Sequence, residues 1–179
     1  MKVQPGQVRG FLRDPGNTRV VLLYGDDLGM IRERAEILVR LIAGTLDDPF
    51  RVTELAREDI RRLPDEASEG SLMGGRRVIR VREATDAAAD PVSQTLKRNI
   101  TSLVVLEAAG LATRAKLRTL VEAAPDGAAI GCYPEEGRAL EETIRATLKA
   151  ASVGVHPDAL TWLSQHLGAD RSAYPTDPA

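Results

Sequence analysis

The chain has 179 residues, 43% of them hydrophobic and 28% charged, so it is long enough for one full α/β core and a small additional unit. Its net charge of −2 argues against tight, autonomous binding to a DNA backbone. Aromatic residues make up only 3% and there is one cysteine, Cys132, which excludes a base-stacking platform, an internal disulfide framework and a multi-cysteine metal site.

The N-terminal residues 1–15 have no apolar stretch of about seven or more residues, so they do not form a signal peptide. The longest unbroken apolar run, residues 20–24, is far shorter than the roughly 20 residues that a membrane span needs. We therefore expect a cytoplasmic protein without a membrane segment.

Strands alternate with helices from residue 19 onwards, which is typical of a mainly parallel sheet. Residues 19–24 (RVVLLY) form a continuous apolar run, as expected for a strand buried on both faces. Apolar residues then recur at steps of three and four between Leu28 and Ile42. This spacing predicts a helix that ends near Gly44 and packs on that strand.

Residues 77–82 alternate, with Ile79 and Val81 on one face and Val78, Arg80 and Arg82 on the other. The pattern predicts a strand with a half-solvated face, and we interpret its arginines as charges that protect a sheet edge from pairing with another strand. Further strands are predicted at 50–55, 102–106 and 128–133, and further helices at 59–69, 91–98 and 113–123. The sequence thus predicts an α/β fold with five strands.

Beyond Pro134 the pattern changes to helices only. Apolar residues at helical spacing mark one helix between Leu140 and Leu148 and another between Leu160 and Leu167. We expect a domain boundary near Pro134, with one domain over residues 1–134 and a partial helical domain over 135–171. Residues 172–179 have two prolines and no periodicity, so we expect a disordered tail.

The turn after the first predicted central strand is where doubly wound folds bind phosphates, because the following helix offers free N–H groups and a positive dipole end. A P-loop counted from Gly25 needs glycine, lysine and a hydroxyl residue at positions 30 to 32. The chain has Met30, Ile31 and Arg32 there. The lysine that contacts phosphate and the hydroxyl that binds magnesium are both missing.

The acidic residues near this turn also differ from those of an ATPase. Asp26 and Asp27 place negative charge where a triphosphate would lie. The strand at 102–106 is followed by Glu107 and Ala108, so the acidic pair of an active Walker B motif is missing. The glycines of the turn then serve only to make it tight. We infer a degenerate P-loop that binds no nucleotide cofactor, formed by Gly25, Asp26, Asp27, Gly29, Ile31 and Arg32.

Asp26 and Asp27 also suggest a receiver-like domain, in which an acidic pair after the first strand holds magnesium. Such a domain needs an aspartate after the third strand, a hydroxyl after the fourth and a lysine before the proline that follows the fifth. The chain has Glu83, Ala108 and Tyr133 at these places. The acidic pair is more typical of an N-terminal helix cap, and a divergent phosphate- or magnesium-binding α/β domain stays the alternative.

Residues 69–78 (EGSLMGGRRV) break the rule that exposed turns are polar, because Leu72 and Met73 stand between glycines. Such side chains either pack under the sheet or project outward into a partner's hydrophobic pocket. An outward pair would bury about 200 Å² of apolar surface and contribute on the order of 4 to 5 kcal/mol gross. That is enough for a binding hot spot, and methionine suits an adaptable surface.

Three blocks of the sequence resemble one protein family in their order and spacing. They are residues 20–36 (VVLLYGDDLGMIRERAE), 47–55 (DDPFRVTEL) and 71–86 (SLMGGRRVIRVREATD). Together with SLVVLEA at 102–108, they resemble the delta subunit of the bacterial DNA polymerase III clamp loader over about residues 8–168. The resemblance includes the degenerate P-loop that distinguishes this subunit from its ATP-binding relatives.

The resemblance implies a RecA-like AAA+ domain followed by a small helical lid domain, in a replication subunit that is not catalytic by itself. It also implies that a Ser-Leu-Phe segment inserts two apolar side chains into the sliding clamp and loosens a clamp interface. In this chain that site is Leu72 and Met73, with Ser71 and Gly70 beside them. Methionine in place of phenylalanine lacks the rigid ring, so we expect a lower affinity.

The family continues into a helical collar domain that holds the loader together, whereas this chain stops about where the lid domain is half complete. We therefore expect the sliding clamp as partner, other clamp-loader subunits only where a collar is supplied, and DNA only indirectly. A third reading is a direct DNA binder that uses an arginine set: Arg61, Arg62, Arg76, Arg77, Arg80 and Arg82.

Overall fold

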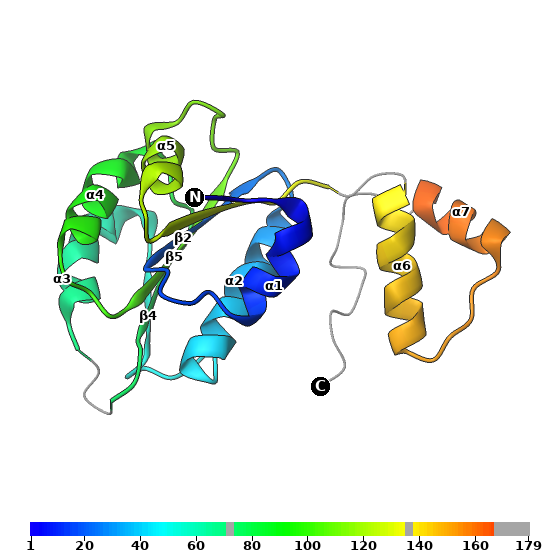
Figure 1. Cartoon of the computed structure of the whole chain (residues 1–179), viewed down its shortest axis with the longest axis horizontal. Helices are drawn as coiled ribbons and strands as arrows, with labels where there is room; N and C mark the ends of the chain where they lie inside the picture. Colours follow the sequence, from blue (N-terminus) through cyan, green and yellow to red (C-terminus); the bar gives the residue numbers. More distant parts are fainter. Residues whose placement is uncertain (71–73, 135–137, 167–179) are drawn as a thin grey trace. The chain divides into compact units, whose positions relative to one another are not determined.

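The computed structural model describes residues 1–70, 74–134 and 138–166 (Figure 1). The chain divides into two compact units, one from Met1 to Cys132 and one from Tyr133 onwards. Among the described residues, no helix is both long enough and apolar enough to cross a membrane.

The first unit is built on one sheet with the strand order β1-β6-β2-β5-β4-β3, in which the strands pair in parallel. Strands β1 and β3 therefore form its two edges. The strands are β1 (Lys2–Val3), β2 (Val20–Gly25), β3 (Val52–Leu55), β4 (Val78–Val81), β5 (Leu103–Ala109) and β6 (Gly127–Gly131).

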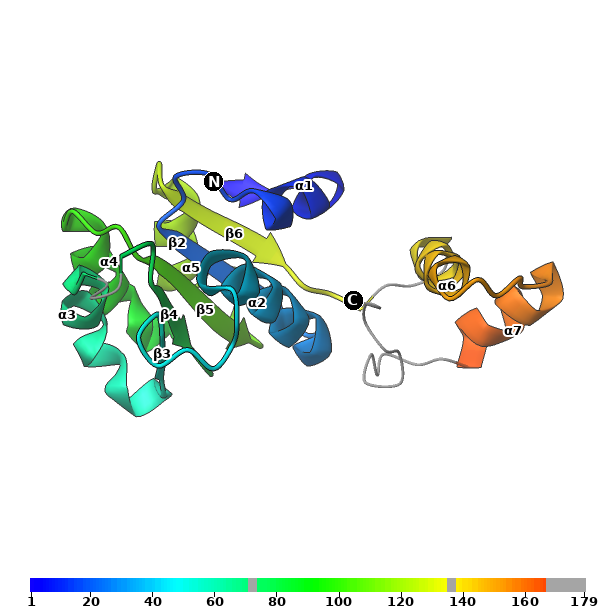
Figure 2. The ribbon, with the colours of Figure 1, turned by 90° about the horizontal axis from the view of Figure 1, so that it is seen from below.

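Helices cover both faces of this sheet, as Figure 2 shows. One face is covered by α1 (Val8–Arg13) and α2 (Leu28–Ala43), and the other by α3 (Leu63–Ser68), α4 (Ala89–Lys97) and α5 (Lys116–Ala123). Short 3₁₀ turns precede α1, α3 and α4, at Pro5–Gln7, Arg57–Arg62 and Asp86–Ala88.

The core has one apolar layer on each side of the sheet. All six residues of β2 are buried. Leu22 and Tyr24 belong to the layer under α3, α4 and α5, while Val21 and Leu23 belong to the layer under α1 and α2. A central parallel strand needs apolar side chains on both faces, so the strand predicted over residues 19–24 is confirmed.

The sheet has six strands, so the prediction of five was one too few. The additional strand is β1, in which Lys2 and Val3 pair with Ala129 and Ile130 of β6. Two residues are too short to show the alternation by which a strand is recognised in a sequence. The other five strands lie where the pattern predicted them, within a few residues at their ends.

Strand β4 lies inside the sheet, between β5 and β3, and all of its residues are buried. The prediction of an edge strand with a half-solvated face is therefore wrong. Arg80 is only 3% exposed and forms ion pairs with Glu107 of β5 and with Glu54 beside it on β3. An internal strand accommodates this arginine because the neighbouring strands supply carboxylates that pair with the charge.

The second unit contains α6 (Arg138–Ala150) and α7 (Pro157–His166), which confirms the two predicted helices. Ile144 of α6 and Leu160 of α7 are each 3% exposed, and the two helices contact each other. The tail expected to be disordered, residues 172–179, lies outside the described residues.

Candidate functional site

The turn between β2 and α2 is the first candidate site. Strand β2 ends at Gly25 and α2 begins at Leu28, so only two residues connect them. Asp27 is the N-cap, since its Oδ1 accepts a hydrogen bond from the Met30 N–H at 2.8 Å. This confirms the capping interpretation for Asp27. Its carboxylate takes the place at the helix N-terminus where an anionic ligand would bind.

The backbone that follows β6 closes the same turn. Gly25 has a φ of +135°, and a Cβ at this residue would lie 2.0 Å from the carbonyl oxygen of Cys132. The Asp27 N–H donates to that oxygen at 3.1 Å, and the Cys132 N–H donates to the Tyr24 carbonyl at 2.6 Å. Only glycine permits this approach, so Gly25 serves the contact with Cys132 as well as the turn.

Doubly wound sheets bind ligands outside the carboxyl ends of two strands whose connections leave to opposite faces. Here these strands are β2 and β5, because α2 covers one face and α5 the other (Figure 2). The Gly110 N–H donates to the Gly25 carbonyl at 3.0 Å, directly across their ends. Backbone hydrogen bonds therefore join the ends of β2, β5 and β6 where a phosphate group would enter.

The remaining residues of the predicted degenerate P-loop are divided between core and surface. Ile31, at the position where a P-loop has lysine, is 2% exposed and packs in the layer under α2. Asp26, Gly29 and Arg32 are exposed. The turn thus has a capping carboxylate, Asp27, and a buried aliphatic side chain, Ile31. A P-loop instead has a lysine that contacts the phosphate.

The ends of β4 and β5 carry separated acidic residues. Glu107 of β5 is held by Arg80 and is followed by the buried Ala108. Beyond β4, Glu83 is exposed and has a φ of +53°. Within residues 1–70, 74–134 and 138–166, no cluster of three or more His, Cys, Asp or Glu side chains is placed to hold a metal ion.

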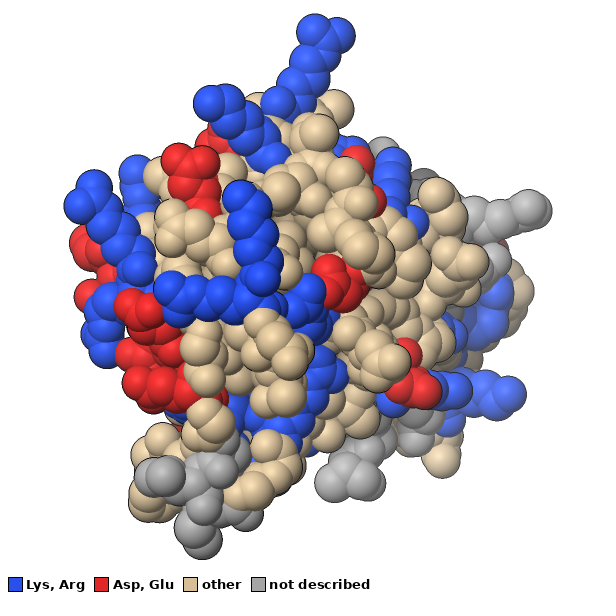
Figure 3. Space-filling model, turned by 60° about the vertical axis from the view of Figure 1, so that its left-hand side comes forward, with Lys and Arg blue, Asp and Glu red and all other residues tan. Residues whose placement is uncertain are grey.

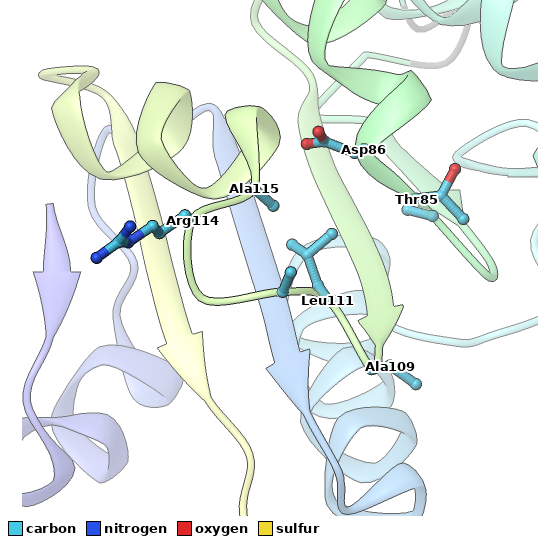
Figure 4. A pocket seen from close by; sticks show the side chains of 9 residues that line it. Thr85, Asp86, Ala109, Leu111, Arg114 and Ala115 are labelled. Carbon is cyan, nitrogen blue, oxygen red and sulfur yellow. The ribbon is translucent and has the colours of Figure 1, made fainter.

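A hollow of about 420 Å³ lies at the carboxyl ends of β4 and β5 (Figure 4). Its walls are mainly small side chains and Leu111. Asp86 Oδ1 accepts a hydrogen bond from the Leu117 N–H at 2.8 Å, so this carboxylate caps α5. Arg114 points away from Leu111 and Asp86 in Figure 4. The charged groups at this hollow are therefore directed elsewhere, and its shape does not identify a ligand.

The predicted clamp-binding segment lies between α3 and β4. Leu72, Met73 and Ser71 lie outside the described residues, so the outward projection of the two apolar side chains stays a prediction. Gly70 is exposed, as is Gly74 on the other side. Gly74 has a φ of +76° and Gly75 a φ of +79°, a conformation that L-residues rarely adopt.

Five of the six arginines considered as a DNA-binding set form contacts within the protein, namely Arg62, Arg76, Arg77, Arg80 and Arg82. Arg76 donates to three backbone carbonyls, those of Gly16 at 3.3 Å, Thr101 at 3.0 Å and Thr18. Burial lowers the pKa of Arg76, although a guanidinium stays protonated in proteins. Arg76 thus joins the start of β4 to the segments before β2 and β5.

The other arginines of the set mostly pair with carboxylates. A hydrogen bond to Glu54 at 2.7 Å raises the pKa of Arg82, and Arg62 lies 2.6 Å from a carboxylate oxygen of Glu66. On the face shown in Figure 3, basic and acidic side chains are intermixed. These contacts give little support to a phosphate-binding surface, which needs cations that face the solvent.

Sequence reasoning missed the residues that close the β2–α2 turn from outside it. Cys132 acts here through its backbone N–H and carbonyl, which carry no side-chain signal. Gly110 follows β5 with a φ of +64° and acts through its backbone N–H. Both contacts depend on strand order, which is a property of the folded sheet.

Two solved structures share the fold of this chain. The first is a DNA polymerase III gamma subunit-related protein from Thermotoga maritima, with a TM-score of 0.51 and 15% identity over 78% of this chain and 49% of that protein. The second is AMPPCP-bound DnaA from Aquifex aeolicus, with a TM-score of 0.51 and 10% identity over 92% of this chain and 58% of DnaA. This chain therefore covers less than two thirds of either protein.

Comparison of the sequence with family models and with curated proteins finds no match. The strand order and the two likenesses show a RecA-like α/β fold.

Proposed function

We propose that this chain is a clamp-loader component of the delta type, which binds and opens the sliding clamp of DNA polymerase III without ATPase activity of its own. The observation that carries the proposal is the closed β2–α2 turn in an AAA+ fold. The Cys132 carbonyl and the Asp27 carboxylate lie where phosphate oxygens would need positive groups. A domain of this fold without a nucleotide site is suited to act through a partner.

The AAA+ fold by itself does not exclude a nucleotide, since the DnaA structure of this fold holds AMPPCP. Two features of this chain support a domain without a nucleotide: the Cys132 carbonyl lies next to Gly25, and Ile31 stands in place of the lysine. The second belongs to the degenerate P-loop, which separates the delta subunit from its ATP-binding relatives in the sequence resemblance. The proposed domains are an AAA+ domain over residues 1–134 and a partial lid over 135–171.

We place the clamp contact at Leu72 and Met73, with Ser71 and Gly70 beside them. The described neighbours Glu69, Gly70 and Gly74 are all exposed, which supports a contact with a partner at this segment.

Clamp binding by the wild type and by the double variant Leu72→Ala and Met73→Ala tests this assignment. Loss of two central anchors should weaken binding roughly a hundredfold. Leu28→Ala is a matched control, because Leu28 is a large apolar residue on α2 that is 68% exposed. Equal binding by the double variant refutes the site, and a wild type that does not bind the clamp refutes the function.

The alternative, a phosphate- or magnesium-binding domain, uses Asp26 and Asp27. One of the two carboxylate oxygens of Asp27 already accepts the Met30 N–H and caps α2. Titration with Mg-ATP and with acetyl phosphate should show no binding and no modification. A positive result in either titration would favour the alternative.

A further inference from the structure

The chain leaves the first unit directly after β6. Strand β6 ends at Gly131, and Cys132 is the last residue of this unit. Cys132 is fully buried, whereas the next residue, Tyr133, is 50% exposed. The chain therefore passes from the interior to the surface within one residue, at a place that is set by the contacts of Gly131 and Cys132.

Backbone hydrogen bonds join Cys132 to both ends of the β2–α2 turn. Its N–H donates to the Tyr24 carbonyl at 2.6 Å, and its carbonyl accepts the Asp27 N–H at 3.1 Å. Asp27 is the N-cap of α2. The Cys132 carbonyl thus occupies an N–H group at the N-terminal end of a helix, the kind of donor that binds anions in other proteins.

Arg34 of α2 holds the residue before Cys132. Strand β1 pairs with Ala129 and Ile130, so Gly131 lies one residue beyond the last of these pairs. At that place Arg34 Nη1 donates to the Gly131 carbonyl at 2.9 Å and lies 3.4 Å from Cys132 Sγ. One guanidinium group therefore contacts the end of the strand and the thiol that follows it.

The position of Arg34 makes this contact a firm one. Its neighbours on α2, Ile31, Ala35 and Leu38, are at most 2% exposed, so the helix that carries the guanidinium group is packed on the sheet. Arg34 itself is partly buried. A hydrogen bond from a charged donor is stronger than one between neutral groups, and partial exclusion of water strengthens it further.

We propose that Gly131 and Cys132 form a latch on the β2–α2 turn, which opens locally while the rest of the sheet stays folded, and that Arg34 is the positioning residue that keeps it shut. The shut latch occupies the Asp27 N–H and fixes the place where the chain leaves the first unit. Strand ends open at a lower free-energy cost than the strands of a core. This inference does not depend on binding of the sliding clamp.

Cys132 reports directly on the latch, because it is the only cysteine of the chain and its side chain is buried. The rate at which a neutral thiol reagent labels Cys132 is measured on the full chain in low, increasing concentrations of denaturant. Hydrogen exchange of peptides that cover residues 129–134 and 20–25 is measured on the same samples. The free energy of unfolding comes from a separate denaturant titration.

Arg34→Met should label about tenfold faster than the wild type, since it loses a hydrogen bond from a charged group. The labelling rate should depend little on denaturant, because a local opening exposes little surface. Exchange should become faster in peptides of residues 129–134 and stay unchanged in those of 20–25. Arg40→Met is the matched control: Arg40 lies on the same helix, is 58% exposed and pairs with Glu36 at 3.5 Å. It should label at the wild-type rate.

Three results would overturn the proposal. Labelling of Arg34→Met at the wild-type rate removes the role of Arg34. Equal acceleration in Arg40→Met shows a general effect of charge removal from α2. Wild-type labelling that rises with denaturant as steeply as global unfolding shows that no local latch exists. Should Arg34→Met not fold, Arg34→Gln has a shorter side chain with a neutral donor and should give the same pattern of faster labelling.

Discussion

The β2–α2 turn and residues 70–76 between α3 and β4, called here the 70–76 loop, both contain glycines, but they lie at opposite ends of the parallel strands. The turn follows the carboxyl end of β2 and is closed by backbone hydrogen bonds from Gly110 and Cys132. The loop precedes the amino end of β4 and is exposed at its described ends, where Arg51 and Arg77 contact the carbonyls of Arg76 and Glu69. The difference shows that backbone contacts join the strand ends at one edge of the sheet, while the described residues at the other edge are exposed.

The largest effect in this comparison is expected from Gly25→Ala. The new Cβ would lie 2.0 Å from the Cys132 carbonyl oxygen at a φ of +135°, so β2 and β6 would have to separate. We expect a loss of more than about 3 kcal/mol in the free energy of unfolding, measured by denaturant titration. Gly10→Ala in α1, with no atom within 4 Å of its Cβ, should be neutral or slightly stabilising. A stable Gly25→Ala protein would show that the turn is not closed in this way.

Asp27→Ala should have a smaller effect, because it removes the cap of α2 without a steric clash. Loss of the hydrogen bond to the Met30 N–H should cost about 1 kcal/mol. Asp26→Ala is the matched control, since Asp26 is exposed and does not cap the helix, and its effect should lie within about 0.5 kcal/mol. If both variants lose the same stability, the cap is not what fixes the start of α2.

Gly74→Ala should have an effect on stability no larger than that of Asp27→Ala, and it sharpens the contrast with Gly25. Among the described residues, no atom lies within 4 Å of a Cβ at Gly74, and its φ of +76° opposes the substitution. We expect a loss of about 1 kcal/mol in unfolding free energy. Gly70→Ala should be close to neutral, because no described atom lies within 4 Å of a Cβ at Gly70 and its φ is not positive. A loss as large as that of Gly25→Ala would mean that the loop is packed rather than exposed.

Much of the fold was accessible from local patterns. The run RVVLLY marked β2, the helical spacing after Leu28 marked α2, and the residue types at the turn identified Asp27 as a cap. These predictions succeeded because burial on two faces, amphipathic periodicity and capping are each set by residues close together in the chain.

The position of each strand in the sheet was not accessible in the same way. The alternation in residues 77–82 indicated a half-exposed edge, yet β4 is internal and Arg80 is buried between Glu54 and Glu107. A buried, paired arginine and an exposed arginine give the same pattern in the sequence of their own strand. The carboxylates that pair with Arg80 come from other strands, so that pattern does not reveal them.

The sequence alone determined the alternation of strands and helices, the cap on α2 and the missing P-loop lysine, since each of these depends on neighbouring residues. Only the tertiary structure decided that Cys132 and Gly110 form hydrogen bonds with the end of β2 and the turn that follows it. The residues in those contacts are brought together by the parallel strand order, through hydrogen bonds between segments up to about 100 residues apart in the chain.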